Sequence, residues 1–481
     1  MTSNSSSSVS SMEQRLLPIE FLILGGGVAG LCSAITLTRA GHQVTLLERD
    51  SDITETRGAV GCRLPPNMTK FLSRWGMEDK LSKLASTSRT LYLVQFESGD
   101  ILGKHVWQEE VLKETGGDYI CMHYSTLRKL LFETALENGA TILQNSVIQS
   151  ISVNPGVRPS LELTTGQKFE ADVLIGADGA SSIARRAVVG QDLQSTFLGM
   201  VLYNVVVSGE EMMSDSELAE LLEHDTSYSW LGNGRGACGF PMLRKGCDNG
   251  EKDYTLTIWI PYDNNPEDGW NHFVETSTLL RDIGDCDKKL RKLASLASSV
   301  IRIPISESPE LEDWVHEDGH LLLVGDAAHA FFPGSLQAIS IAAGDAAALG
   351  RIFQHLHHES QIESLLWGFE EIRQKRVSQM REAEMTFLSS MTMPNGPAQE
   401  ARDARIKRRY ELGLNALDNS DGSGPGQWDS VKDTFGYDAE DEADDWWMKW
   451  GKLKERAEFV EAVSPGFVIE VNQEASVSSA L

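Results

Sequence analysis

The sequence predicts an α/β fold in which a Rossmann-type dinucleotide-binding domain is interleaved with a second, mostly antiparallel β-sheet domain and followed by a C-terminal helical segment. Three observations predict this fold. A strand, glycine turn, helix and strand follow one another from Ile19. Segments rich in Val, Tyr, Trp and Ile, with polar breaks between them, fill Thr196 to Pro261. A buried strand at Leu321 to Val324 and two helical patterns then return, so the first domain is interrupted and resumed.

These patterns predict five regions. They are a disordered tail (residues 1–18), the first part of the nucleotide-binding domain (19–195), the β-sheet domain (196–315), the resumed nucleotide-binding domain (316–390) and a C-terminal helical extension with a tail (391–481). In the extension we expect a helix from Ala439 to Glu458, with Trp446 and Trp450 on one face. A docking helix that buries this face is the main interpretation, and a partner-binding helix is the alternative.

Composition excludes several classes of protein. The chain has 481 residues, 70 acidic and 43 basic, for a formal net charge of -27. Such a surface repels nucleic acid and anionic lipid, although a local arginine cluster can still bind a small anion. The six cysteines are scattered, which argues against a disulfide framework and a metal site. No segment has the roughly 20 apolar residues of a membrane span, and the Ser-rich start is no secretory signal. We therefore expect a cytoplasmic protein.

The motif Gly25-Gly26-Gly27-Val28-Ala29-Gly30 lies between the strand Phe21–Leu24 and the helix Val28–Ala40. Gly25 allows the tight turn, Gly27 lets a pyrophosphate approach the helix N-terminus, and Gly30 lets helix and strand pack closely. Glu48 ends the next strand, where a carboxylate can accept the hydroxyls of an adenosine ribose. The acid would repel the 2′-phosphate of NADP, so this motif predicts FAD or NAD.

A second match to the same pattern, Gly234 to Gly239, has a different interpretation. It runs into Phe240-Pro241 rather than into a helix, and no strand ending in an acid follows. We predict a glycine-rich turn between strands.

Two further motifs follow buried strands. Gly176-Ala177-Asp178-Gly179 leads into a basic turn with Arg185 and Arg186, where loop amides can face phosphate. Gly325-Asp326 begins a segment that continues through His329 to Pro333 and into an apolar helix. A carboxylate at the carboxyl edge of a sheet suits a polyol, and the helix N-terminus can point amides at an electron-rich ring.

The three motifs, in this order, resemble the class A FAD-dependent monooxygenases, and the segment Arg63-Leu64-Pro65-Pro66-Asn67 resembles the salicylate-hydroxylase-like branch. The resemblance covers Ile19 to Arg376 and selects FAD over NAD. It implies a role for each matching position. Gly25, Gly27, Gly30 and Glu48 would hold the ADP half of FAD, Gly61 would lie along the cofactor, Asp178 and Gly179 would lie between FAD and NAD(P)H, Asp326 would bind the ribityl chain, and Pro333, Gln337, Ala338 and Ile339 would border the isoalloxazine.

The chain departs from the family at three positions. Tyr124 stands where the family has an FAD-contacting Arg, and Arg128 is our candidate replacement. Ala338 replaces a Gly, which adds a methyl group where backbone approaches the ring. Asn204 stands where phenol-hydroxylating relatives often carry an Arg after Tyr203. We nevertheless name Tyr203, Asn204 and Pro333 as catalytic candidates. Trp230, Phe240, Pro241 and Met242 are further lining candidates, each with plain core packing as the alternative.

The resemblance implies that NAD(P)H reduces FAD, that O2 adds at flavin C4a, and that the hydroperoxide hydroxylates an aromatic or phenolic small molecule, a secondary metabolite. Two alternatives remain open. One is epoxidation, oxidative decarboxylation or Baeyer–Villiger oxidation of a metabolite. The other is an FAD-binding protein with little turnover. The sequence does not select NADH or NADPH, nor an oligomeric state.

Overall fold

The structure of the protein is a computed structural model. It describes residues 16–54, 60–246, 250–263, 266, 272–297, 299–418 and 427–455. Nearly all of the tail predicted for residues 1–18 lies outside the described residues, as does the predicted disordered end from Asn472. Within the described part of the chain, no helix is both long and apolar enough to cross a membrane.

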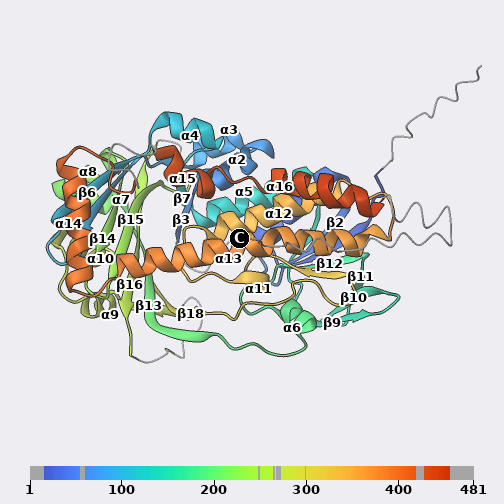
Figure 1. Cartoon of the computed structure of the whole chain (residues 1–481). Helices are drawn as coiled ribbons and strands as arrows, with labels where there is room; N and C mark the ends of the chain where they lie inside the picture. Colours follow the sequence, from blue (N-terminus) through green and yellow to red (C-terminus); the bar gives the residue numbers. More distant parts are fainter. Residues whose placement is uncertain are drawn as a thin grey trace, which may run out of the picture.

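A five-stranded, all-parallel sheet forms the nucleotide-binding domain, at the right in Figure 1. Its strands, in spatial order, are β19 (Leu321–Leu323), β12 (Val173–Gly176), β1 (Glu20–Leu24), β2 (Gln43–Leu47) and β8 (Thr141–Leu143). Leu22 pairs with Leu174 on one side and with Thr45 on the other, so β1 lies at the centre. Because β19 follows the second domain in the sequence, the predicted interleaving is confirmed.

Two parallel helices fix the end of the sheet at which a ligand can bind. They are α1 (Val28–Ala40), with the bounds predicted, and α12 (Ala338–Phe353). Thr36 donates a hydrogen bond to the carbonyl of Ala346 at 2.7 Å, and a side chain at Gly350 would collide with Thr36. A Cβ at Gly325 would meet Ala29 and Ala342, near the two helix starts. Both helix N-termini therefore lie together at the carboxyl edge of the strands, where partial positive charge gathers.

The second domain is an eight-stranded sheet, at the left in Figure 1. Its strands, in spatial order, are β17 (His272–Val274), β18 (Val300–Glu307), β13 (Thr196–Val207), β16 (Lys252–Pro261), β15 (Gly236–Leu243), β14 (Thr226–Leu231), β5 (Thr90–Gln95) and β6 (Ile101–Val106). All neighbours are antiparallel except β14 and β5. The sheet thus also takes two strands from residues 19–195, which the strand-rich segment after Thr196 did not suggest.

The two faces of this sheet have different neighbours. Tyr203 pairs with Ile258 and Asn204 with Thr257, and side chains alternate along a strand. Tyr203 and Ile258 belong to the core beneath four helices, while Asn204 and Thr257 face the opposite side. The helices are α7 (Gly209–Met212), α8 (Ser216–Glu223), α9 (Thr276–Asp282) and α10 (Lys288–Ser295).

The glycine-rich segment from Gly234 forms a hairpin, as predicted. Leu231 pairs with Gly236, so the turn is confined to residues 232–235 and strand β15 starts inside the motif. No helix follows it, which removes this segment as a nucleotide site.

Shorter elements complete the fold. They are β3 (Gly61–Leu64), β4 (Ser86–Thr87) and β7 (Ile120–His123) in one small sheet, β9 (Ile148–Asn154), β10 (Val157–Leu163) and β11 (Lys168–Glu170) in another, and the helices α2 (Pro66–Arg74), α3 (Glu78–Leu84), α4 (Glu109–Thr115), α5 (Tyr124–Glu137), α6 (Ile183–Val189) and α11 (Asp326–His329). Helix α13 (Gln361–Met391) then runs across both domains (Figure 1).

The C-terminal extension runs from the second domain back to the first. Helix α14 (Pro397–Glu411) packs on β6, α15 (Gln427–Phe435) on α4 and α2, and α16 (Ala439–Trp446) on α12 and α13. Arg351 forms an ion pair with Asp444 at 2.6 Å, and Arg74 with Asp438 at 2.7 Å. The extension therefore braces the helices that carry the nucleotide-binding motifs.

The predicted tryptophan face is wrong in one position. Trp446 is buried, but Trp450 is 57% exposed and Trp447 is buried instead, stacked on His355 with ring centroids 4.3 Å apart. The α-helix gives way to a π-helical turn, Trp447–Gly451. The wider turn rotates the following residues, so the α-helical spacing used for the prediction no longer applies.

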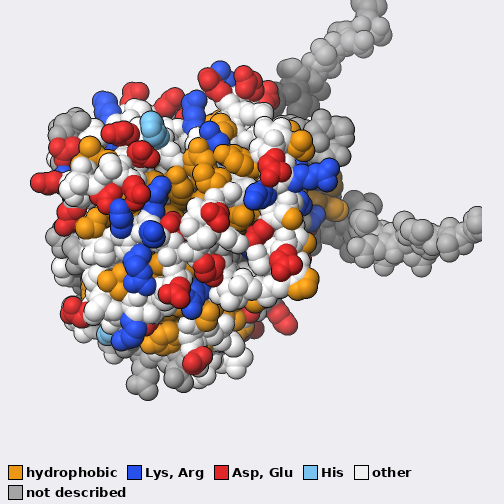
Figure 2. Space-filling view, turned by 90° about the vertical axis from the view of Figure 1, so that its left-hand side faces the viewer, with side chains coloured by type: hydrophobic (Ala, Val, Ile, Leu, Met, Phe, Trp, Pro, Cys, Tyr) orange, Lys and Arg blue, Asp and Glu red, His pale blue; other side chains and the backbone are white. Residues whose placement is uncertain are grey.

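Positive charge gathers on one face despite the net charge of -27. Figure 2 shows a broken column of Lys and Arg side chains on the face that carries α14, whose sequence contains five basic residues. The excess of acid is therefore not uniform over the surface.

Candidate active site

The glycine loop is tightly packed at Gly25 and Gly30 and open at Gly27. Gly25 has a φ of 105°, and a Cβ there would lie 2.5 Å from the carbonyl oxygen of Ala177. A Cβ at Gly30 would collide with the carbonyl oxygen of Gly25. At Gly27, by contrast, no described atom lies within 4 Å of the position that a Cβ would take. The opening is at the start of α1, where free N–H groups can bind a pyrophosphate.

Glu48 and Arg128 lie beneath this loop. Glu48 accepts hydrogen bonds from the N–H groups of Gly26 at 2.7 Å and Asp50 at 2.9 Å, and from Arg128 at 3.1 Å. Arg128 also donates to the carbonyl of Gly26 at 2.9 Å. Arg128 lies one helical turn after Tyr124 on α5, and both side chains line a cavity between the two domains, called the central cavity below. Glu48 is buried behind Arg128 and does not line this cavity.

The second motif contacts the first and third motifs rather than the cavity. Asp178 accepts hydrogen bonds from Ser182 at 2.5 Å and from the N–H of Ile183 at 2.7 Å, at the start of α6. Gly179, which follows, has a φ of 80°. Arg185 donates to the carbonyls of Asp326 at 2.5 Å and Ala327 at 2.7 Å. Neither Asp178 nor Gly179 lines the cavity, so contact of either with FAD or NAD(P)H stays a prediction.

Asp326 lies at the sheet edge and lines the cavity, as the sequence led us to expect. Gly325, with a φ of 58°, makes the turn that precedes it. Burial raises the pKa of the Asp326 carboxyl group above its usual range, against the opposing attraction of His329 and Arg185. A polyol hydroxyl placed there would find an acceptor.

A buried ionic network behind Asp326 was missed in the sequence. Asp345 accepts from the N–H of Gly325 at 2.9 Å, from His329 at 2.6 Å and from Arg373 at 2.8 Å. Arg373 also donates to the hydroxyl of Tyr437 at 2.7 Å. The network ties the Gly325 turn to α12, to α13 and to the C-terminal extension. A His and an Asp sixteen residues apart, in a strand–loop–helix segment, were its only sequence signal.

A cavity of about 480 Å³ lies between the two domains. One wall comes from the nucleotide-binding domain and the other from the open face of the large sheet. The lining residues are Arg49, Asp50, Val60, Gly61, Cys62, Arg63, Tyr124, Arg128, Asn204, Phe240, Thr257, Ile303, Asp326, Phe331, Phe332, Pro333, Gly334, Ser335, Leu336, Ala338 and Ile339.

Most predicted flavin-edge residues lie in this wall. Pro333, Ala338 and Ile339 line the cavity, with Ala338 as the first residue of α12. Gly61 lines it too, and a Cβ there would lie 2.5 Å from Thr255 on the large sheet. The side chain of Gln337 does not reach the cavity, because it is buried and hydrogen-bonded to Asn67 and Ser340.

Two predicted substrate-side residues must be corrected. Tyr203 is fully buried on the far side of the sheet, where its hydroxyl donates to Asp282 at 2.5 Å. Trp230 lies in the same core and donates to Asp287 at 2.9 Å. Strand alternation explains this: Asn204 lines the cavity, so its neighbour Tyr203 points away. A lining or catalytic role for Tyr203 is therefore not retained.

Of the other lining candidates, only Phe240 reaches the cavity. Pro241 and Met242 are buried in β15 without lining it. Arg63 is the functional candidate that the sequence did not single out, although it lies in a quoted motif. A charged residue within the short, otherwise apolar strand β3 was the available signal.

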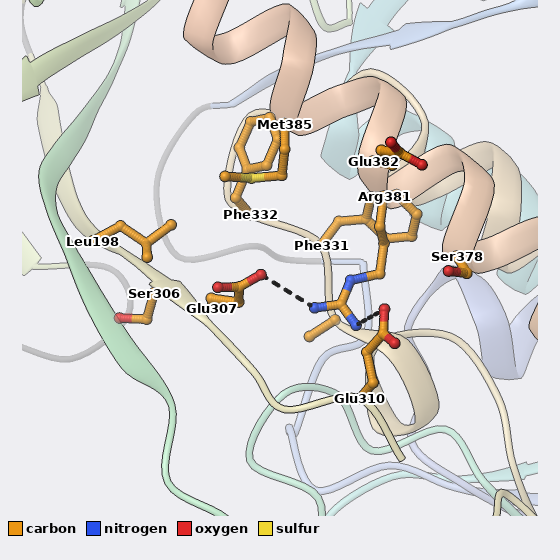
Figure 3. A pocket seen from close by; sticks show the side chains of 11 residues that line it. Leu198, Ser306, Glu307, Glu310, Phe331, Phe332, Ser378, Arg381, Glu382 and Met385 are labelled. Atoms are coloured by element: carbon orange, nitrogen blue, oxygen red, sulfur yellow. Dashed lines mark ion pairs between the residues drawn. The ribbon is translucent and has the colours of Figure 1, made fainter. Parts of the chain in front are cut away.

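A second, smaller pocket of about 180 Å³ lies on the other side of Phe331 and Phe332. Figure 3 shows Arg381 in this pocket, facing Glu307 and Glu310. Its nitrogens lie 3.9 Å and 3.6 Å from their carboxylates, and it donates to the carbonyl of Ser308 at 2.9 Å. The charge of Arg381 is therefore compensated within the protein.

The residues of the central cavity fit FAD. The opening at Gly27 gives room for a pyrophosphate, Asp326 offers an acceptor for the ribityl chain, and the start of α12 borders the place for a flat ring system. This fold and site define a dinucleotide-binding flavoprotein with a separate substrate sheet.

Known proteins share these features. A family model described as the FAD binding domain matches residues 19–384. The FAD-dependent monooxygenase OpS4 of Beauveria bassiana is 28% identical over 390 residues, which cover 80% of this chain and 88% of that protein. The 3-amino-4-hydroxybenzoate 2-monooxygenase PtmB3 of Streptomyces platensis is 23% identical over 391 residues, covering 81% and 93%.

A solved salicylate hydroxylase substrate complex superposes with a TM-score of 0.68 at 20% identity, covering 89% of this chain and 97% of that one. This likeness concerns the fold. The FAD binding domain model matches this chain over most of the chain's length, and the relatives it resembles are FAD-dependent monooxygenases. The chain therefore belongs to the class A FAD-dependent monooxygenase family. It is an FAD-dependent monooxygenase.

Proposed function

We propose that this enzyme uses NAD(P)H and O2 to hydroxylate an aromatic or phenolic small molecule, a secondary metabolite. The observation that carries the proposal is the cavity itself. Its wall combines Phe240 and Ile303 of the large sheet, and Phe332 of the loop before α12, with the polar pair Asn204 and Thr257. Apolar walls with a few placed polar groups suit a flat ring that carries hydroxyl or related substituents. The name of PtmB3, a hydroxybenzoate monooxygenase, supports the same substrate class.

FAD supplies the redox chemistry when bound: it takes electrons from NAD(P)H and activates O2 for transfer of one oxygen atom. The chain's own residues bind, orient and exclude water. Thr257 donates to the amide oxygen of Asn204 at 3.1 Å, which leaves the amide N–H groups of Asn204 free to contact a substrate oxygen. Phe331, Phe332 and Pro333 close the cavity toward the second pocket, and this keeps water from the reacting atoms.

The test is product analysis with isotopically labelled O2. Purified FAD-loaded protein would be mixed with NADH or NADPH and with a panel of phenols and aromatic acids. We expect one of them to stimulate oxidation of the nicotinamide, and its product to carry one labelled oxygen on an intact ring. Full FAD occupancy with no stimulated oxidation by any compound, and no labelled product, would overturn the proposal.

The same products separate the other chemistries. Loss of a carboxyl group as CO2 indicates oxidative decarboxylation, a labelled epoxide indicates epoxidation, and a labelled ester indicates Baeyer–Villiger oxidation. The methyl group of Ala338 narrows the space in which the backbone at the start of α12 can approach the flavin ring. Replacement with glycine is therefore expected to change the rate of flavin reduction and to leave the product unchanged.

A further inference from the structure

Arg63 brings a positive charge into the central cavity. It lies on β3, and its side chain lines the cavity beside Phe240 and Gly334. Its guanidinium carbon lies 5.7 Å from the centroid of the Phe240 ring. One nitrogen donates to the carbonyl of Gly334 at 3.4 Å, which is a long hydrogen bond. A guanidinium has five N–H donors, so most of its donor capacity is uncommitted.

The nearby carboxylates do not neutralise this charge. Among the described residues, no carboxylate oxygen lies within 4.0 Å of the guanidinium of Arg63. Glu384 is near enough to attract it, but its carboxylate accepts the N–H of Leu336 at 2.8 Å and the hydroxyl of Ser335. Asp326 also lines the cavity without pairing with Arg63. A partly buried cation in this state gains most from an incoming anion.

Arg381, across Phe331 and Phe332, shows the contrast (Figure 3). Glu307 and Glu310 lie on either side of its guanidinium. An anion that enters the smaller pocket would have to displace these carboxylates. The molecule therefore has two neighbouring arginine sites, and only the one at Arg63 opens into the central cavity with spare donors.

The surroundings of Arg63 favour a flat acid. Phe240 and Leu336 supply apolar walls next to it, and Asn204 supplies an amide from the sheet. The planar guanidinium fork matches the two oxygens of a carboxylate better than a single oxygen. A ring held between these walls would point its acidic group toward β3 rather than toward β13, where Asn204 replaces the arginine seen in the family pattern.

We propose that Arg63 binds the carboxylate of an aromatic carboxylic acid and so selects the substrate class of this enzyme. The proposal rests on the proposed function, because it assigns the position of that enzyme's substrate. It places the ring between Phe240 and the Phe332–Gly334 loop, with the polar Asn204–Thr257 pair along one edge.

The test measures ligand binding and needs no turnover. FAD-loaded protein would be titrated with benzoate, salicylate, 2-naphthoate and indole-2-carboxylate, each beside its uncharged carboxamide, and the flavin absorbance would report binding. We expect at least one acid to bind roughly 10- to 100-fold more tightly than its amide, the range expected for a charge-assisted hydrogen bond.

Three variants locate the effect. Arg63→Met should abolish the preference for the acid, and Arg63→Lys should keep part of it. Arg381→Met is the matched control, an arginine next to the cavity that is already paired, and it should keep the full preference. FAD occupancy and thermal stability, measured for every variant, identify any that fails to fold.

The proposal would be overturned if the acids and amides bound equally to the wild-type protein, or if none of the acids bound. It would also be overturned if the preference for the acid survived in a folded Arg63→Met. If that variant in addition lost FAD, Arg63 would be a flavin contact instead. A protein that prefers the acids but incorporates no oxygen would contradict the proposed function and leave the assignment of Arg63 standing.

Discussion

Arg128 and Glu48 form an ion pair beneath the glycine loop, with Nη2 of Arg128 3.1 Å from Oε2 of Glu48. The two side chains hold Gly26 from both sides, because Arg128 donates to its carbonyl and Glu48 accepts from its N–H. Arg128, our candidate replacement for the arginine that the family places at Tyr124, therefore contacts the glycine loop. A contact of Arg128 with FAD stays a prediction.

Arg128→Met is expected to weaken FAD binding about tenfold or more. The change frees the Gly26 carbonyl and leaves the buried carboxylate of Glu48 without its cation, at a cost of about 1–3 kcal/mol. Fluorescence titration of the apoprotein with FAD measures the loss. Lys129→Met is the control, since Lys129 is exposed on the same helix and pairs with the exposed Glu133. Equal FAD affinity in the two variants would contradict the prediction.

Tyr203 and Asn204 are neighbours with opposite expected phenotypes. Tyr203→Phe removes the hydrogen bond to Asp282 and should cost about 1.5–3 kcal/mol of unfolding free energy. It should leave the binding of 2-naphthoate unchanged. Asn204→Ala should alter that binding severalfold with little loss of stability, because its side chain faces the cavity. Urea unfolding and flavin absorbance titration measure the two effects, and the reverse pattern would show that the sheet faces are misassigned.

The network around Asp345 predicts a large loss of stability in Arg373→Met. Removing one partner leaves a buried carboxylate undercompensated, which costs about 3–5 kcal/mol. Tyr437→Phe removes the hydroxyl that accepts from Arg373 and donates to Glu442 at 2.8 Å, so about 1–3 kcal/mol is expected. Lys449→Met, at an exposed pair with Asp445, should change stability by less than about 1 kcal/mol. Urea unfolding should rank the three variants in this order, and similar losses in all three would refute the buried network.

Acidification is expected to loosen the C-terminal extension first. Burial lowers the pKa of His105 to about 4, against the attraction of Asp418, and burial also lowers the pKa of His355 to about 4. Both contact the extension, His105 through Gln427 and His355 through Trp447. Below the ordinary value of 6.5 the unfolded chain takes up protons that the folded chain does not, so stability falls between pH 6.5 and 4.

Hydrogen exchange across residues 427–451, at pH 7 and pH 5, tests this loosening. After division by the intrinsic exchange rate, which itself falls with pH, the protection factors should be lower at pH 5 than at pH 7 in the wild-type protein. His355→Phe keeps the ring stacked on Trp447 but cannot take up a proton, so the pH effect should shrink in this variant. A thermal midpoint independent of pH over this range would contradict the lowered pKa values of His105 and His355.

The sequence predicted the elements with strong local signals. The bounds of α1 were correct because Gly27 and Gly41 punctuate an apolar helix, and Gly325-Asp326 marked the carboxyl edge of β19. The position of Tyr203 was wrong because periodicity identifies a strand but not which face meets a cavity. Strands β5 and β6 joined the large sheet through long-range pairing, which local patterns do not encode.

The candidate site was predictable only where a backbone requirement fixes the residue type. Gly25, Gly30 and Gly61 stand where another chain segment approaches closely. Arg373 and Tyr437 act through contacts between segments far apart in the sequence, so no local pattern marks them. Arg63 had only a weak local signal, as a charged residue in the otherwise apolar strand β3. The π-helical turn at Trp447 was missed for a related reason, since the packing of Trp447 on His355 accompanies a departure from α-helical spacing.

The bracing of α13 by Tyr437 has a consequence for biosynthesis. Domains tend to fold from the N-terminus while the ribosome is still at work, but this nucleotide-binding domain lacks its strand β19 until residue 321 is made. Arg373 then lacks its hydroxyl partner until the extension emerges. The nascent chain therefore exposes an incomplete flavin site for most of translation, and we expect full FAD affinity only once the C-terminal extension has been synthesised.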